Sequence, residues 1–512
     1  MLPFYAGEGL MAKSSFTRRE FLKISALGSS ALAWGGCASA ERFFMGDARD
    51  LRSEVVILGA GAAGLAAAFE LKKKKIPFRI FEASSRVGGR VQSVPVFGDS
   101  GPVGELGAEF FDNSHVQLLS LAKELNLPVR EIKTPTDVEA HLFSFDGKQY
   151  RVKDLLPRMK SLQTPLRRVR LDLYRDQDVV LSYKNAFQYE RAAYYDTLSL
   201  KDLLESWSSE VDPVLRQLIE VQAVSRFGLD AVDQSSLHFL STVDAEGSSL
   251  LGARTTYRME GGLSNLMQTL ASRVAGVIPD YSVKMNMALV EMSFENETFE
   301  LIFQGPQGKE TFRTRNVICT IPFSKLREVK GFMDLDISSL KKEAVRTQEY
   351  ATHSKGLIPF AAPFWKNRSG STPANLGNFT GDFTSEKIWD SGRSQPGTQG
   401  LLTWQRGGSA GLKAGASATE DTLKDLGLFY GEVPSKFNGR DQMVNWKQRK
   451  WSLGSMAVFK PGQYMKYRGA AGEPELNGQL LFAGEHTSLR FAGTLQGAIE
   501  TGQKAAAAVT LG

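Results

Sequence analysis

Residues 54–90 read EVVILGAGAAGLAAAFELKKKKIPFRIFEASSRVGGR, and the elements predicted within this stretch decide the fold. Glu54–Leu58 is a short apolar run rich in β-branched residues, which predicts a buried strand. The alanine-rich segment Ala62–Lys74 predicts a helix, and Pro77–Phe81 predicts a second strand. Strand, helix and strand in this order indicate a βαβ unit with parallel strands.

Three glycines, Gly59, Gly61 and Gly64, form a G-x-G-x-x-G pattern between the first strand and the helix. Gly59 permits the tight turn, Gly61 lets the backbone approach a pyrophosphate, and Gly64 lets the helix lie close on the sheet. The unpaired N–H groups and the dipole of the helix N-terminus favour an anion at this place. Glu82 follows the second strand, where its carboxylate can accept both ribose hydroxyls and would repel a 2′-phosphate. The unit is therefore predicted to bind a dinucleotide.

The RVGGR run, Arg86–Arg90, places two guanidiniums and two glycines beside the expected pyrophosphate. This run and the glycine pattern together resemble the flavin-containing amine oxidase family, which includes monoamine, polyamine and L-amino-acid oxidases. The resemblance implies FAD as the cofactor. Further segments that match the family are GELGAEFF at 104–111, YRMEGGLSNLMQTLASRV at 257–274, the β-rich stretch 283–302, and LLFAGEHTSLRFAGTLQGAIETGQKAA at 480–506.

The resemblance also implies the roles of single residues. Leu289 is at the position that packs on the adenine, and Glu485 is at the position that bonds the ribityl chain. A helix entered at Gly493 or Thr494 would point its N-terminus at the pyrimidine end of the flavin, where its dipole stabilises negative charge. The residues implied to contact FAD are Gly59, Ala60, Gly61, Ala62, Gly64, Glu82, Ala83, Arg86, Gly89, Arg90, Gly107, Ala108, Glu109, Leu289, Trp446, Gly484, Glu485, Thr494 and Leu495.

A nucleotide domain assembled from such distant segments implies that the stretches between them form a second domain. We predict an α/β protein with a discontinuous Rossmann-like FAD-binding domain and an inserted α+β substrate-binding domain. Helical patterning is seen within the insertions at 155–175 and 200–207. A cleft between two domains is a common place for a cofactor-sized site. The predicted FAD domain comprises 53–113, 246–334 and 442–512, and the substrate domain comprises 114–245 and 335–441.

Lys355 is the predicted catalytic residue. It lies eight residues before the Pro-Phe-Trp of Pro363–Trp365, on a strand-like run, and matches the flavin-facing lysine of the family. In relatives this lysine holds a water against flavin N5. Reduced flavin passes an electron to O₂, and a fixed cation favours the superoxide anion that forms.

The expected substrate pocket departs from well-known relatives. Amino-acid oxidases hold the substrate carboxylate with an arginine where this chain has Phe110, and an apolar ring cannot offset a buried carboxylate. The aromatic pair of monoamine oxidases matches Met456 and Thr494, so that cage is absent. Ser455 stands where those enzymes attach FAD through a cysteine, so we expect noncovalent FAD. Phe110, Phe227 and Met456 are predicted to line an apolar substrate pocket.

The predicted activity is oxidation of an amine, with hydride transfer to flavin N5 and reoxidation by O₂ to H₂O₂. One alternative is an L-amino-acid oxidase or tryptophan 2-monooxygenase-type enzyme, which Phe110 disfavours. A second is a flavin-dependent desaturase or isomerase, which Lys355 disfavours because such enzymes have less need to activate O₂. A third is a protein that keeps FAD for stability or partner binding without turnover.

The first forty residues are predicted to be an export signal. Thr17–Lys23 reads TRREFLK, a twin-arginine motif, and an uncharged segment of eleven residues, Ile24–Trp34, follows it. This segment is too short to span a membrane, and cleavage after Ala40 fits an A-x-A site. The expected location is the periplasm or the medium. Two points stay open, namely whether Cys37 is lipidated, which would bring the protein to a membrane, and whether translation starts at Met1 or Met11.

Composition is that of a folded enzyme. With 42% hydrophobic residues in 512 positions the chain can form a large core, and the net charge of +6 is too small to indicate nucleic-acid binding. Of the two cysteines, Cys37 lies in the predicted leader, so Cys319 has no partner for a disulfide or a cysteine-based metal site. The five histidines show no ligand spacing, and no metal is expected.

Overall fold

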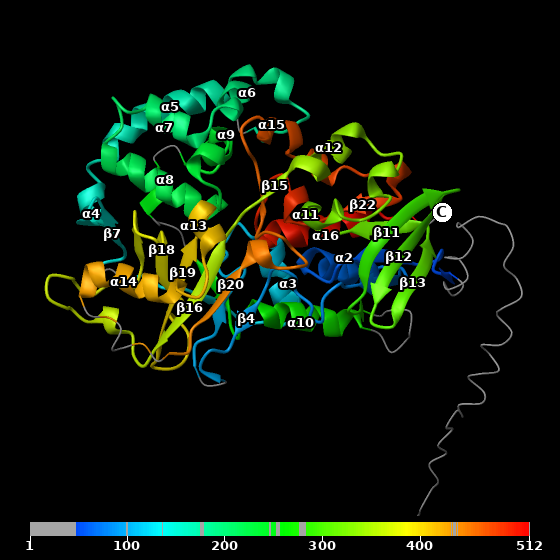
Figure 1. The fold of residues 1–512 in the computed structure, drawn as a ribbon, viewed down its shortest axis with the longest axis horizontal. Helices are drawn as coiled ribbons and strands as arrows, with labels where there is room; N and C mark the ends of the chain where they lie inside the picture. Colours follow the sequence, from blue (N-terminus) through cyan, green and yellow to red (C-terminus); the bar gives the residue numbers. More distant parts are fainter. Residues whose placement is uncertain are drawn as a thin grey trace, which may run out of the picture. The chain divides into compact units, whose positions relative to one another are not determined.

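The computed structural model describes residues 48–98, 101–135, 137–174, 179–244, 247–251, 256–275, 283–431, 433, 437 and 439–510. The predicted leader, with Met11 and Cys37, lies outside these residues. Residues Ala48–Gly512 form one compact unit (Figure 1). Within the described part of the chain, no helix is both long and apolar enough to cross a bilayer.

A five-stranded sheet, in which every pair of neighbours is parallel, forms the nucleotide-binding half. The predicted strand, helix and strand are present as β2, α2 and β3, and each boundary lies within one residue of its predicted place. The strands come from distant parts of the chain, as the discontinuous prediction requires. In spatial order they are β10 (Val283–Lys284), β3 (Phe78–Phe81), β2 (Val55–Leu58), β14 (Asn316–Cys319) and β22 (Leu480–Phe482), and α2 spans Ala62–Lys73.

Both faces of this sheet are buried, which is why its strands are continuous apolar runs. Val55 and Ile57 face the layer of α2, α10 (Leu263–Val274) and α16 (Leu495–Ala508), whereas Val56 and Leu58 face the other core. On that second face Phe81 stacks on Phe303 with ring centroids 4.2 Å apart. Phe303 lies on β12 (Thr298–Gly305), which pairs antiparallel with β11 (Ala288–Glu295) and β13 (Gly308–Thr314).

A seven-stranded, mostly antiparallel sheet forms the other half, together with a group of helices (Figure 1). The helical patterns predicted near 155–175 and 200–207 correspond to α5 (Lys160–Tyr174) and α7 (Leu200–Ser206). The strands in spatial order are β20 (Gln442–Asn445), β16 (Ser354–Phe360), β19 (Gly400–Arg406), β18 (Lys387–Asp390), β17 (Phe379–Gly381), β7 (Leu142–Phe145) and β8 (Lys148–Arg151).

Two elements near the predicted domain limits pack with the other half. Strand β20 falls at the start of the third predicted FAD segment, yet it pairs with β16 in the seven-stranded sheet. Helix α3 (Val116–Glu124) falls in the predicted substrate domain, yet Leu118 and Leu121 share the core of α2 and α16. The exact limits of the two domains stay a prediction.

Candidate active site

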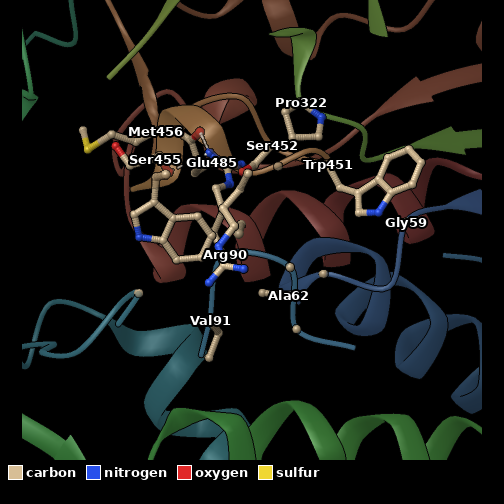
Figure 2. Close-up of a pocket in the computed structure, with 18 of the residues that line it drawn as sticks. Gly59, Ala62, Arg90, Val91, Pro322, Trp451, Ser452, Ser455, Met456 and Glu485 are labelled. Carbon is tan, nitrogen blue, oxygen red and sulfur yellow. Dashed lines mark hydrogen bonds and ion pairs between the residues drawn. The ribbon is translucent and has the colours of Figure 1, made fainter. Parts of the chain in front are cut away.

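A cavity of about 1250 Å³ extends from the glycine turn after β2 to Lys355 on β16. It exceeds the roughly 300–1,000 Å³ of pockets for drug-sized ligands, so it has room for a large cofactor and a small substrate. Figure 2 shows Gly59, Arg90, Pro322, Ser455 and Glu485 around part of it. Its walls come from segments distant in sequence, within 58–63, 81–92, 106–110, 286–289, 320–329, 446–456 and 484–498.

The glycine turn shapes one end of the cavity. Gly59 has φ +106°, a conformation that side chains rarely adopt, and a Cβ on Gly64 would lie 2.0 Å from the Gly59 carbonyl oxygen. No side chain caps the N-terminus of α2, whose first residues Ala62 and Ala63 line the cavity. Its first N–H groups lack helical partners, so they can bind an anion.

Glu82 lies beside this turn at the end of β3. One carboxylate oxygen accepts the Ala60 N–H at 2.8 Å, and the other accepts the N–H and the hydroxyl of Ser84 at 2.8 and 2.7 Å. A carboxylate offers about four lone-pair positions, so one stays available to a ligand hydroxyl and not the two that both ribose hydroxyls would need.

The two arginines of the RVGGR run bind protein groups. The Arg86 guanidinium donates to the carbonyl of Val91 at 3.0 Å and to that of Gly89, which closes its own loop. The Arg90 guanidinium donates to Glu485 at 2.6 Å and to the Ser455 carbonyl at 3.0 Å. Both arginines line the cavity, and they fix the loop and the wall against which a cofactor would lie.

Glu485 joins the C-terminal segment to this wall. Besides Arg90, its carboxylate accepts the N–H groups of Ala457 at 3.0 Å and Gly493 at 2.9 Å. Thr494 is the N-cap of α16 and accepts the Gly497 N–H at 3.1 Å, so the helix begins where the sequence predicts. The N-terminus of α16 points its dipole at the cavity, which Thr494 and Leu495 line.

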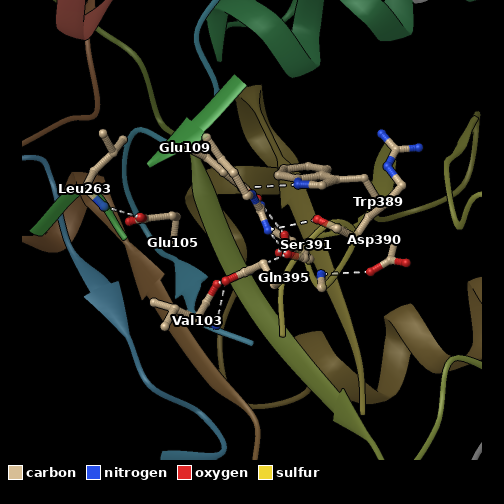
Figure 3. Close-up of polar contacts among 12 residues, drawn as sticks. Val103, Glu105, Glu109, Leu263, Trp389, Asp390, Ser391 and Gln395 are labelled. Atoms are coloured by element: carbon tan, nitrogen blue, oxygen red, sulfur yellow. Dashed lines mark hydrogen bonds and ion pairs between the residues drawn. The ribbon is translucent and has the colours of Figure 1, made fainter. Parts of the chain in front are cut away.

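Lys355 and Glu109 form a buried ion pair at the far end of the cavity, with side chains 6% and 4% exposed. The Lys355 ammonium donates to the Glu109 carboxylate at 2.7 Å and to the Gly107 carbonyl at 3.2 Å. Figure 3 shows Ser391 and Trp389, which donate to Glu109 at 2.7 and 3.1 Å. Arg258 also donates to Glu109, at 3.2 Å. Burial alone would raise the pKa of Glu109, but the charges of Lys355 and Arg258 outweigh it and hold that pKa below its usual range.

Two further buried groups adjoin this network. Burial raises the pKa of Glu105 to about 7, although its carboxylate accepts the Leu263 N–H and the Ser93 hydroxyl. Burial also lowers the pKa of His353 to about 4, so this ring is neutral at physiological pH. His353 lines the cavity and bonds through Nδ1 to the Ser455 hydroxyl at 2.7 Å.

All but four of the predicted site residues line the cavity, including Lys355, Phe110 and Met456. Ala60 and Glu109 stand behind the wall as hydrogen-bond partners, and Gly64 serves the close packing of helix on strand. Phe227 was expected in the substrate pocket and is not there. It is 3% exposed, and its ring lies 4.2 Å from His238 in the helical core, because that face of its helix turns away from the cavity.

The sequence did not reveal several groups at the substrate end. Gln222, Ser225 and Arg226 on α8 (Pro213–Phe227) line the cavity there, and so do Lys387 and Gln405 on the sheet. No motif marks them, because only the pairing of distant strands brings Lys387 and Gln405 beside Lys355. The one local signal is that Lys387 and Trp389, two residues apart on β18, fall on the same face of the strand.

The residues present fit FAD. The open N-terminus of α2 suits a pyrophosphate, Glu82 suits a ribose, and Leu289 offers an apolar surface for an adenine. A Cβ on Gly89 would lie 3.4 Å from Gly61, so the two glycines face each other across a narrow cradle. Within the described residues, no group of three or more His, Cys, Asp or Glu side chains could hold a metal ion.

Comparisons with known proteins agree with this geometry. The model of the family described as flavin containing amine oxidoreductase matches residues 62–510. The flavin-dependent L-tryptophan oxidase RebO of Lentzea aerocolonigenes is 25% identical over 495 residues, which cover 90% of this chain and 98% of that protein. Flavin-containing amine oxidase B of Sus scrofa is 22% identical and covers 89% of this chain and 85% of its own length. The solved structure of wild-type putrescine oxidase bound to putrescine matches the fold with a TM-score of 0.73 and 20% identity, covering 90% of this chain and 99% of that one.

Proposed function

The chain belongs to the flavin containing amine oxidoreductase family, and from this premise we propose that it oxidises an amine to an imine with noncovalently bound FAD. The observation that carries the proposal is one continuous cavity that joins the glycine cradle and Glu82 to the buried Lys355. FAD, when bound, would supply a hydride acceptor and a route for the electrons to O₂, with hydrogen peroxide as the product. Hydrolysis of the imine then gives an aldehyde and ammonia.

The protein's part in this reaction is to position the reactants and to fix charge. Lys355 is a cation held in one place by Glu109 and the Gly107 carbonyl, so its charge can stabilise an anion formed from O₂ without reorganisation. Phe110, which is 37% exposed, and Met456 give the substrate end apolar surface on which a substrate can pack. No protein nucleophile is needed.

The test follows the absorbance of the bound flavin at about 450 nm. The purified protein is mixed anaerobically with a panel of amines and amino acids, and bleaching reports reduction. Air is then admitted to wild type, to Lys355→Met and to the control Lys148→Met, whose lysine is exposed on β8. We expect Lys355→Met to be reduced but to reoxidise at least about tenfold more slowly, since a lost electrostatic contact of this kind costs that much or more. A colourless protein would refute the proposed function. Equal reoxidation rates in wild type and Lys355→Met would refute the role of Lys355.

The absence of a covalent link is proposed from Ser455, which lines the cavity where relatives use a cysteine. Acid precipitation separates the two cases. Noncovalent FAD stays in the supernatant, and covalent FAD precipitates with the protein.

Export by the twin-arginine pathway is proposed from the TRREFLK motif. This pathway moves folded proteins, which suits an enzyme that acquires FAD before export. Cell fractionation tests it: the protein is expected outside the cytoplasm, and Arg18→Lys with Arg19→Lys should retain it inside. Loss of a membrane-bound fraction in Cys37→Ser would identify a lipoprotein.

A further inference from the structure

Three polar side chains form a row across the seven-stranded sheet at the substrate end of the cavity. In the register of the sheet, Lys355 on β16 is opposite Gln405 on β19, and Gln405 is opposite Lys387 on β18. Residues directly opposite each other have Cβ atoms about 4.5–5.5 Å apart and share a face. All three line the cavity, and the strands that carry them lie side by side in Figure 1. The row therefore leads from the predicted catalytic lysine out into the substrate space.

The two lysines of this row differ in their partners. The charge of Lys355 is balanced by Glu109 at 2.7 Å. The ammonium of Lys387 makes no hydrogen bond or ion pair with any residue the structure describes, and the Trp389 ring lies 6.0 Å from it. Lys387 is nevertheless only partly exposed. A half-buried cation with no carboxylate in direct contact is costly unless a ligand supplies one.

The surrounding wall holds a second cationic side chain. Arg226 lines the same end of the cavity from α8. Burial and then the charge of Arg226 lower the pKa of Lys387, the charge of Glu109 raises it, and that of Lys355 lowers it, so all three charged groups are within electrostatic reach of Lys387. Among the described residues that line the cavity, the carboxylates are Glu82 and Glu485, and both are engaged near the glycine turn and Arg90. A second cation on the substrate would therefore be repelled here, and an anion would be attracted.

We propose that Lys387 binds a carboxylate of the substrate, so that the preferred substrates are amines with an acidic group remote from the oxidised carbon. This inference rests on the proposed amine oxidase activity. Neighbouring strands are about 4.8 Å apart, so Lys387 lies roughly 10 Å along the sheet from Lys355. That distance suits an ω-amino acid, whose carboxylate is several bonds from the reacting C–H. Lys387 would thus bind a substrate carboxylate at a different place from the arginine of amino-acid oxidases, whose position Phe110 occupies in this chain.

The experiment compares three amines of equal chain length on the holoenzyme: 5-aminopentanoate, pentylamine and 1,5-diaminopentane. Their far ends are anionic, neutral and cationic. Anaerobic flavin reduction gives kcat/KM for each, with wild type, Lys387→Met, Lys387→Arg and the control Lys148→Met. Pentanoate, which has the carboxylate and no amine, is titrated into the same four proteins by calorimetry.

We expect 5-aminopentanoate to be preferred over pentylamine by at least about tenfold, since a charge-assisted hydrogen bond contributes that much. Lys387→Met should lose the preference through KM and weaken pentanoate binding by a similar factor, while Lys387→Arg and Lys148→Met keep both. Equal kcat/KM for 5-aminopentanoate and pentylamine in wild type, or pentanoate binding unchanged in Lys387→Met, would overturn the inference.

The two proposals fail separately. If no amine reduces the flavin, the proposed oxidase activity is wrong, and pentanoate binding still decides whether Lys387 binds an anion. If Lys387→Met fails to retain FAD, the Lys387→Arg protein and the substrate order of wild type decide the matter instead.

Discussion

Replacing Glu109 by glutamine is the sharpest test of how the active site is held together. Glu109 accepts hydrogen bonds from Lys355, Arg258, Trp389 and Ser391, which use all of about four lone-pair positions of its carboxylate. Glutamine has the same shape, but its amide has one acceptor oxygen and brings two donors of its own. At least two of the four donors would then lose their acceptor, and two buried cations would lose their counter-charge.

The expected cost follows from burial. Removing one partner of a buried ion pair costs about 3–5 kcal/mol, because the remaining charge stays buried without compensation. At about 2.1 cal/mol/K per residue, unfolding of a unit the size of Ala48–Gly512 has an entropy of about 1 kcal/mol/K. The melting temperature of Glu109→Gln should therefore fall by about 3–5 °C.

Differential scanning calorimetry of the holoenzyme measures this shift, and Glu260→Gln is the matched control. Glu260 pairs with Arg130 at 2.7 Å, but both side chains are 40% or more exposed, so that pair contributes about 1 kcal/mol or less. A Glu109→Gln protein that melts within 1 °C of Glu260→Gln would refute the idea that the buried network stabilises the fold.

Two further predictions concern the cradle and the pH dependence. Gly64→Ala should lose most of its bound FAD and about 1–3 kcal/mol of stability, since its Cβ would overlap the Gly59 carbonyl oxygen. The flavin-to-protein absorbance ratio measures the FAD retained. The control Gly427→Ala, whose Cβ would meet open space, should retain FAD. The pKa of Glu105 in the folded protein, about 7, lies above its ordinary 4.5, so the stability it contributes is full below pH 4.5 and is lost as pH rises toward 7. That loss amounts to about 3 kcal/mol. Between pH 4.5 and 7.5 the melting temperature of Glu105→Gln should therefore fall less with rising pH than that of wild type. Equal falls in the two proteins would contradict the raised pKa of Glu105.

Local sequence was enough to predict the strand, glycine turn and helix that shape one half of the cavity. The glycine turn, the N-terminus of α2 and Glu82 lie within thirty residues, and their geometry depends on backbone rules that act over short distances. The helix expected to be entered at Gly493 or Thr494 is present as α16, which begins at Leu495 after its N-cap Thr494.

The substrate half could not be predicted in the same way. Phe227 is an apolar residue at the end of α8, and nothing in the sequence states which face of that helix meets the cavity. The row of Lys355, Gln405 and Lys387 depends on the register of three strands separated by long connections. A slip of one residue in any of them would turn its side chain to the opposite face.

Under the two proposals, Lys355 acts in catalysis and Lys387 acts in substrate selection. Lys355 is fixed by Glu109, and its position is tied to the stability of the fold, so changes in this pair are expected to affect melting and reoxidation together. Lys387 has no described partner whose loss would strand a buried charge, so Lys387→Glu should alter the substrate without a comparable loss of stability. A glutamate at this position would oppose carboxylates and attract cations, and 1,5-diaminopentane should then become the preferred amine of the three. We therefore expect changes at Glu109 to affect stability and changes at Lys387 to affect substrate preference. The reason is that Lys355 has a carboxylate partner within the protein and Lys387 has none in contact.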